Sequence, residues 1–374
     1  NAGNLTVSAR NIQIIGGSGS SEKIRSGLFA ASVDKRGKGD GGDLKVTVAE
    51  SLTLRDGAQI ATTSFAEGNA GNLTVSARNI QIVGGGEGTP SGLCAVVNPG
   101  AKGDGGDLEV TVAESLTLRD GAQISTTSFA EGNAGNLTVS ARNIQIIGGG
   151  EGTLSGLFAQ VEPEAKGKAG DLTVTVAKSL TLRDGAQIAV KTLGQGDAGN
   201  ITIYAREIEI IGKSPDGKKL GSQITAEARR EATGAAGTIT INTETLNLRN
   251  EAEITVKSAT PEPAGDLEIN SNNIRLENQA RLTAETQAGD QGSITINNNK
   301  DLILRNNSRI TTNATTDSAT GGNITIDTEN LVAPDDSDIS ANAEAAFGGR
   351  VNITAAGIFG TEFRPEPTDK SDIT

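Results

Sequence analysis

The chain has few residues from which a nucleophilic or metal-dependent active site could be built. It contains no histidine and a single cysteine, Cys94. The absence of histidine excludes Ser-His-Asp and Cys-His catalysis as well as histidine-ligated metals. Carboxylates are plentiful, and a convergent pair could cleave a glycosidic bond, but such a pair should form a cluster that occurs once. No such cluster occurs, so the sequence predicts a non-enzyme without catalytic residues, cofactor or metal ligands; a polysaccharide-acting enzyme is the least favoured alternative.

The carboxylates instead recur in register with a long internal repeat. The string NAGNLTVSARNIQI begins at positions 1, 69 and 133, and a degenerate copy begins at position 197. The string SLTLRDGAQI begins at positions 51, 115 and 179. Such spacing is typical of a solenoid, which grows by adding units and needs no separate domain cores.

Each long repeat divides into two halves that open in the same way. A glycine is followed by one variable residue and then by an alternating apolar run. Twelve such openings occur, at Gly3, Gly42, Gly71, Gly106, Gly135, Gly170, Gly199, Gly237, Gly265, Gly292, Gly322 and Gly349. We interpret each opening as the start of one coil.

The interval that follows Gly42 contains three short segments of period two, at 44–48, 51–54 and 58–62. Period-two alternation predicts strands, whereas no apolar stripe of helical period persists. The sequence therefore predicts an all-β parallel β-helix with three strands per coil and about twelve coils. A single solenoid is expected over 1–360, followed by a proline-containing loop and the start of a further coil over 361–374.

A polar residue follows the second predicted strand of many coils. Asp and Asn tolerate left-handed backbone angles, so a ladder of equivalent tight turns is expected at these positions. They are Asp56, Asp120, Asp184, Asn250, Asn278, Asn306 and Asp335.

Cys94 occupies the position of a phenylalanine in the matching SGLFA segments. The equivalent residues are Phe29 and Phe158, and Ile224 is assigned to the next copy. A position that accepts Phe, Cys and Ile predicts packing into the lumen rather than a reactive thiol.

Longer segments interrupt alternate coils at 16–25, 84–90, 148–154 and 212–221. Insertions that project from one side of a solenoid often form its binding surface. The acidic string GDGGDL occurs at Gly39 and Gly103, where we expect solvated turns; calcium binding stays open.

Charge and composition limit the partners. The net charge of −13 argues against nucleic acid and anionic membrane surfaces. No apolar run reaches the roughly 18 residues of a membrane-spanning helix. The chain contains no methionine and opens inside a repeat, so a targeting segment is expected to precede it.

The strings GNAGNLTV, SLTLRDGAQISTTSF, SGLFA and GIFGTEFRPEPTDKSDIT resemble the repeat region of cyanobacterial filamentous-haemagglutinin-like exoproteins, the exported partners of two-partner secretion systems. The resemblance covers essentially the whole chain. It implies a right-handed parallel β-helix, export through an outer-membrane transporter, and a secreted or cell-surface location.

Two functions from different classes remain open. One is an adhesive rod that binds glycans or surfaces. The other is a structural filament or cell-envelope element whose coils associate head to tail.

Overall fold

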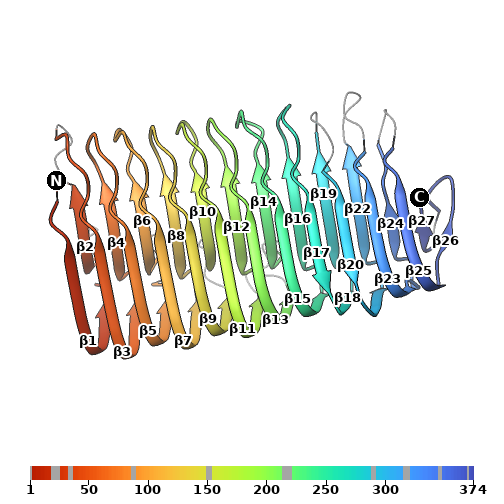
Figure 1. Cartoon of the computed structure of the whole chain (residues 1–374), viewed down its shortest axis with the longest axis horizontal. Coiled ribbons are helices and arrows are strands. Elements are labelled where there is room, and N and C mark those ends of the chain that lie inside the picture. The colour runs from red at the N-terminus through yellow and green to blue at the C-terminus, as the bar shows by residue number, and fades with distance from the viewer. Residues whose placement is uncertain are drawn as a thin grey trace.

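The computed structural model describes residues 2–17, 26–32, 37–85, 90–148, 154–212, 221–287, 292–314, 321–343, 348–368 and 370–374. Every regular element in these ranges is a β-strand. Figure 1 shows the strands side by side along one rod, from the red N-terminal end to the blue C-terminal end. The predicted all-β parallel solenoid is thus confirmed.

The strands form two parallel sheets that run the length of the rod. The first contains β1 (Leu5–Ile15), β3 (Leu44–Arg55), β5 (Leu73–Val83), β7 (Leu108–Arg119), β9 (Leu137–Ile147), β11 (Leu172–Arg183), β13 (Ile201–Ile211), β15 (Ile239–Arg249), β17 (Leu267–Ser271), β18 (Asn273–Glu277), β20 (Ile294–Asn298), β21 (Asp301–Arg305), β23 (Ile324–Val332) and β25 (Val351–Phe359). The second contains β2 (Gly27–Ser32), β4 (Gln59–Ser64), β6 (Gly92–Val97), β8 (Gln123–Ser128), β10 (Gly156–Val161), β12 (Gln187–Thr192), β14 (Gln223–Ala228), β16 (Glu253–Ser258), β19 (Arg281–Thr286), β22 (Arg309–Ala314), β24 (Asp338–Ser340), β26 (Glu362–Phe363) and β27 (Asp372–Ile373).

The first two predicted strands of most coils are one bent strand. Segments 44–48 and 51–54, for example, both lie within β3. Within the described residues, the two halves form separate strands in only two coils, as β17 and β18 in one and as β20 and β21 in the other. The link of one or two residues at the bend is too short to interrupt pairing with the neighbouring coils, so both halves join the same sheet.

The twelve glycine openings each lie two residues before a strand of the first sheet. They stack, and the stacking explains why the residue is glycine. A Cβ atom on Gly106 would lie 2.0 Å from the carbonyl oxygen of Gly71, and one on Gly135 would lie 2.0 Å from that of Gly106. The same close approach recurs along the rod up to Gly349, whose Cβ would meet the oxygen of Gly322 at 1.9 Å. Each coil therefore rests on the backbone of the one before it.

The variable residue after each glycine forms a second ladder that the sequence pattern did not predict. The Asp43 N–H donates to Asn4 Oδ1 at 2.9 Å, the Asn72 N–H to Asp43 Oδ1 at 2.8 Å, and the series continues through Asp107 and Asn136. Asp alternates with Asn over these coils, so two carboxylates are not stacked one strand spacing apart, about 4.8 Å.

The lumen is filled by aliphatic side chains. In β7, Leu108, Val110, Val112, Leu116 and Leu118 are buried, and the residues between them are exposed or partly exposed. Ile80 and Ile144 lie beside Leu116 on the neighbouring strands, and both are buried too. The coils thus share one continuous and largely aliphatic core, which also encloses a few hydroxyl side chains of the second sheet such as Thr62 and Thr126. The charged side chains of the strands lie on the outer surface.

Candidate functional site

The seven predicted turn residues occupy equivalent left-handed turns. Their φ angles are 58°, 58°, 59°, 58°, 55°, 53° and 62° for Asp56, Asp120, Asp184, Asn250, Asn278, Asn306 and Asp335. Asp and Asn reach this region at lower cost than branched residues, which explains their recurrence.

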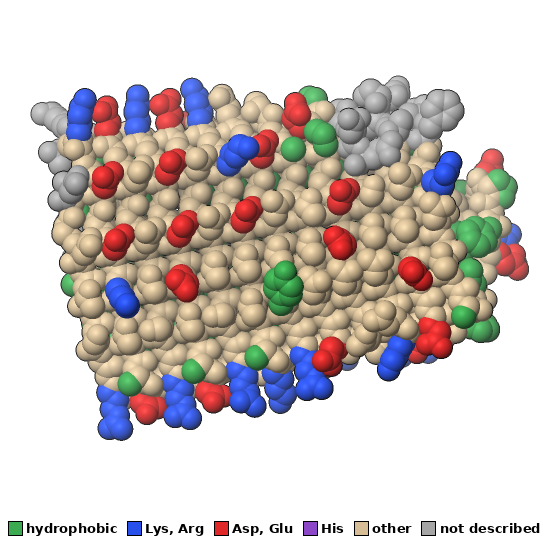
Figure 2. Space-filling model, viewed as in Figure 1, with side chains coloured by type: hydrophobic (Ala, Val, Ile, Leu, Met, Phe, Trp, Pro, Cys, Tyr) green, Lys and Arg blue, Asp and Glu red, His purple; other side chains and the backbone are tan. Residues whose placement is uncertain are grey.

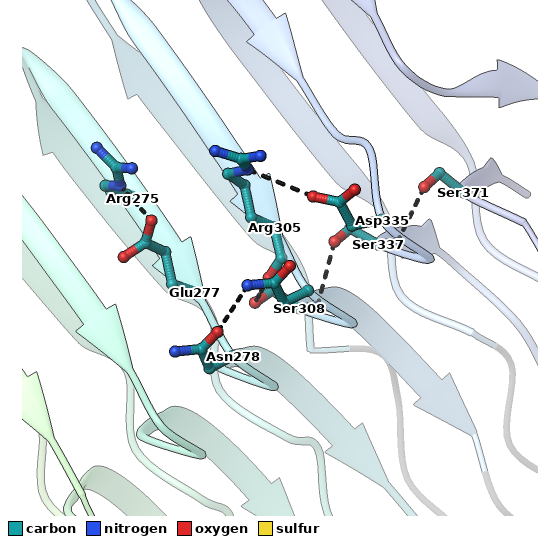
Figure 3. A network of polar contacts seen from close by, with 9 residues as sticks. Arg275, Glu277, Asn278, Arg305, Ser308, Asp335, Ser337 and Ser371 are labelled. Carbon is teal, nitrogen blue, oxygen red and sulfur yellow. Dashed lines mark hydrogen bonds and ion pairs between the residues drawn. The ribbon is translucent and has the colours of Figure 1, made fainter.

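Side chains link these turns from coil to coil (Figure 3). The Asn306 Nδ2 donates to Asn278 Oδ1 at 2.7 Å, and Arg305 pairs with Asp335 at 3.3 Å. Buried serines add a parallel series, in which the Ser337 N–H donates to Ser371 Oγ at 3.0 Å. The coil-to-coil links thus join the turns of Asn250, Asn278, Asn306 and Asp335, whereas Asp120 and Asp184 pair with the arginine that precedes each of them.

The predicted lumen position of Phe29, Cys94 and Phe158 is wrong. The residues in register with them across β4 and β8 are Ala61 and Ser125, and none of the five belongs to the core cluster, which contains the adjacent leucines instead. They lie on the outer face of the second sheet, where Phe29 is 38% exposed.

Cys94 and Phe158 are nevertheless covered, with 8% and 5% exposure. The Phe158 ring lies over Gly156, where a Cβ atom would come within 2.7 Å of the ring. Ile224 does face the core, but it is in register with Ile188 and Leu157. Thr225 is the residue in register with Phe158, so the assigned equivalence was offset by one position.

The remaining predictions concern the insertions and the acidic strings. Most residues of the four insertions lie outside the described part of the chain. In the acidic string at Gly39, Asp40 Oδ1 accepts the Asn69 N–H at 2.9 Å, and Asp43 Oδ1 accepts the Asn72 N–H at 2.8 Å. These carboxylates serve the coil-to-coil ladders, and the described residues contain no cluster of three or more possible metal ligands.

A row of charged side chains follows the bend of the first sheet. The bend of β3, β7 and β11 contains one residue more than the bend of β5 and β9, which produces a β-bulge in each pairing. From the first coil onward the charged residues at the bend are Arg10, Glu50, Arg78, Glu114, Arg142, Lys178, Arg206 and Glu244. Basic and acidic residues therefore alternate until Lys178 stands where the two preceding repeats have glutamate.

The alternation has an electrostatic basis. Arg78 pairs with Glu50 at 3.8 Å, and Arg206 pairs with Glu244 at 3.1 Å. On another edge of the rod, basic and acidic residues alternate without interruption; they are Lys38, Glu67, Lys102, Glu131 and Lys166. Three of the four neighbouring pairs form ion pairs, Lys38–Glu67 at 3.5 Å and Lys102–Glu131 and Glu131–Lys166 at 3.6 Å. Among the described residues, no acidic side chain lies within 4.0 Å of Arg142 or Lys178. Figure 2 shows this run of basic side chains along the lower edge, after a stretch in which acidic and basic ones alternate.

The three successive basic residues Arg142, Lys178 and Arg206, which break the alternation of charge, lie beside a surface hollow of about 710 Å³. Its walls include the small bulge residues Ala113 and Ala177. Its floor is formed by the shorter bend of β9, and its remaining lining residues are Val112, Ser140, Ala141, Arg142, Thr175, Lys178 and Arg206. We call the residues Arg142, Lys178 and Arg206 the basic triad.

Tyr204 does not line the hollow itself but lies one strand beyond its lining residue Thr175. It is the only tyrosine in the sequence, and half of its surface is exposed. It lies opposite Thr175 in the pairing of β11 with β13, and it precedes Arg206 by two residues on the same face. The earlier copies carry Ser76 and Ser140 at this position, so the aromatic ring and Lys178 are both departures from the repeat.

The two residues that depart from the repeat at this site can be found by comparing the repeats in sequence. The string VAKSL at 176–180 replaces VAESL at 48–52 and 112–116, and TIYAR replaces TVSAR. The two changes are 26 residues apart, so only the parallel register reveals that they lie beside one hollow.

A second unusual cation lies on the outer face of the other sheet. Lys191 is only 8% exposed, and its Nζ donates to Gln187 Oε1 at 3.4 Å. Burial lowers its pKa, although Glu227 nearby acts in the opposite direction. The first two repeats carry Thr63 and Thr127 at this position.

Lys191→Thr is therefore expected to stabilise the protein at pH 7 by about 1 kcal/mol. The unfolded chain holds the lysine proton up to a higher pH than the folded chain, so the wild type gains stability as pH rises from the lowered folded pKa toward about 10.4. The stability advantage of Lys191→Thr over the wild type should therefore shrink as pH rises over that range. Urea unfolding of both proteins at pH 7 and pH 9.5 checks this, and an equal difference at both pH values would contradict it.

These features define a class: a parallel β-solenoid with a filled apolar lumen, whose unusual chemistry lies on its outer surface. Within the described residues there is no helix of the length and apolarity needed to cross a membrane. No protein-family model, no curated protein and no solved structure matches the chain. Function must therefore be argued from the surface itself.

Proposed function

We propose that the chain is a non-catalytic extracellular or cell-surface rod that binds glycans or other surfaces through its outer face. The observation that carries the proposal is the contrast between lumen and surface. The lumen repeats mostly aliphatic residues coil after coil, whereas charged and aromatic departures from the repeat such as Lys178 and Tyr204 lie on the outer surface, where Lys178 lines a hollow.

The outer face of the first sheet suits weak, repeated contacts. Ser76, Thr111, Ser140 and Thr175 stand in register on neighbouring strands, and each carries a hydroxyl group on this face. Hydroxyl groups donate and accept hydrogen bonds with sugars, and a row of them allows many weak contacts to act together. A surface location and export through an outer-membrane transporter belong to this proposal through the resemblance of the repeats.

A glycan array probed with the full chain tests the proposal. We expect retention on a subset of glycans, with no release of reducing ends when the same glycans are incubated with the protein in solution. Failure to bind any glycan, cell or abiotic surface would contradict an adhesive role. Glycan cleavage would establish an enzyme instead.

A self-associating filament is the second candidate, because every coil pairs with its neighbours in one parallel register that a further coil could continue. It predicts an average mass that rises with concentration in light scattering, together with end-to-end fibres in electron micrographs. A constant monomer mass at high concentration would exclude it in favour of binding through the sides of the rod.

A further inference from the structure

We infer that the hollow beside β9 is a binding site for a carboxylate-bearing polysaccharide, held by the basic triad and by Tyr204. This inference rests on the proposed function and specifies its ligand. The site lies between the bulges of β7 and β11, in the fifth level of strands from the start of the rod.

The basic triad carries an electrostatic cost. Neighbouring strands are about 4.8 Å apart, so three cations on successive strands repel one another. Glutamate at position 178 would lower this repulsion and would place an acidic side chain beside Arg142, as Glu50 is beside Arg78. Arg206 is already paired with Glu244, so the negative charge that is missing among the described residues is the one opposite Arg142 and Lys178, and a bound anion supplies it.

The groups around the hollow match the chemistry of an acidic sugar. Arg142 offers a planar fork that matches a carboxylate, Lys178 adds a point charge, and Arg206, whose Nε pairs with Glu244, adds its terminal amino groups. Ser140 and Thr175 offer hydroxyl groups, and Ala113, Ala141 and Ala177 leave space for a ring. The exposed ring of Tyr204 provides a flat apolar face on which a sugar ring can stack. A volume of about 710 Å³ is sufficient for a small ligand or a short stretch of a chain.

The length of the basic stretch and the net charge limit which polyanions fit. Glu114 and Glu244 border the triad, so the basic stretch covers about 10 Å of the rod. The net charge of −13 repels the charges of a polyanion outside this stretch, which disfavours the dense phosphates of a nucleic acid more than the sparser carboxylates of an acidic polysaccharide. A polysaccharide with one carboxylate per sugar ring places one or two charges in the site and stacks its apolar ring face on the tyrosine.

Titration calorimetry with a defined oligogalacturonate, at low ionic strength, tests the inference. Lys178→Glu restores the residue of the other repeats and should weaken binding at least tenfold while leaving the melting temperature equal or higher. Tyr204→Ser, which also restores a repeat residue, should weaken binding several-fold. Raising the salt concentration should weaken binding of the wild type much more than binding of Lys178→Glu.

Lys45→Glu is the matched control. It makes the same charge change on the same face, and position 109, which aligns with position 45 through Thr74, already carries glutamate. Its affinity should stay within twofold of the wild type. Equal losses in Lys45→Glu and Lys178→Glu would overturn the inference, because net charge alone would then account for binding.

Three further ligands separate the contributions of the charge, the carboxylate and the sugar ring. A neutral oligosaccharide of equal length should bind at least tenfold more weakly. Preferential binding of a sulfated oligosaccharide would overturn the carboxylate assignment, and binding of an acidic peptide equal to that of the oligogalacturonate would overturn the role of the sugar ring. Glycan binding that survives Lys178→Glu unchanged would refute this site but not the adhesive rod, whereas the array described above tests the rod itself.

Discussion

Gly106→Ala is expected to destabilise the protein by about 3–5 kcal/mol, because the added methyl group has no space. Its carbon would lie 2.0 Å from the carbonyl oxygen of Gly71 and 2.5 Å from the carbonyl carbon. Both obstacles are backbone atoms of the preceding coil, so no side-chain rotation relieves the overlap. The two coils must separate or the strand start must shift.

Gly3→Ala is the control for this substitution. Gly3 opens its coil in the same way, but a Cβ atom there would meet no atom within 4 Å. Its effect should stay within about 0.5 kcal/mol. Because coils interact chiefly with their neighbours, hydrogen exchange should show the loss of protection in Gly106→Ala concentrated around β5 and β7. Equal urea midpoints for Gly106→Ala and the wild type would contradict the stacked-glycine explanation.

Leu116→Ala is expected to cost about 3–4 kcal/mol, the usual result of deleting a fully buried leucine. Leu116 has no exposed surface and lies between Ile80 and Ile144 in the lumen. The neighbouring coils are held apart by their backbone hydrogen bonds and cannot collapse into the cavity.

Thr117→Ala provides the comparison on the adjacent residue of the same strand. Thr117 points to the outer surface and is only partly buried, so its loss should cost less than about 0.5 kcal/mol. Urea unfolding followed by circular dichroism measures both variants. If the two variants lost the same stability, the assignment of the inner face of β7 would be wrong.

Both predictions concern the scaffold that positions the basic triad. The hollow exists because bulged strands flank β9, and that arrangement depends on coils stacking at a constant spacing. A variant that shifts β7, such as Gly106→Ala, should therefore also weaken oligogalacturonate binding, although it lies outside the hollow.

Much of this protein was determined locally by its sequence. Twelve glycines predict the strand starts, and at eleven of them, all except Gly3, close contact with the backbone of the preceding coil admits no side chain. Asp56 or Asn278 predicts a turn because of its own backbone preference. The tertiary structure decided what local pattern left ambiguous. In a six-residue strand, either set of alternate residues could face the lumen. The large ring of Phe158 suggested that its set faces inward, whereas packing places Leu157 and Ala159 inside.

The candidate site is likewise a property of register. Arg142, Lys178 and Arg206 are separated by 36 and 28 residues in the chain, and no local rule relates them. The extra bulge residue in β11 and the parallel pairing of β9, β11 and β13 bring them to one bend. Sequence alone determined that Lys178 departs from the repeat. The stacking of coils decided which charged side chains lie beside it, because the length of each coil sets which residues are neighbours across a solenoid.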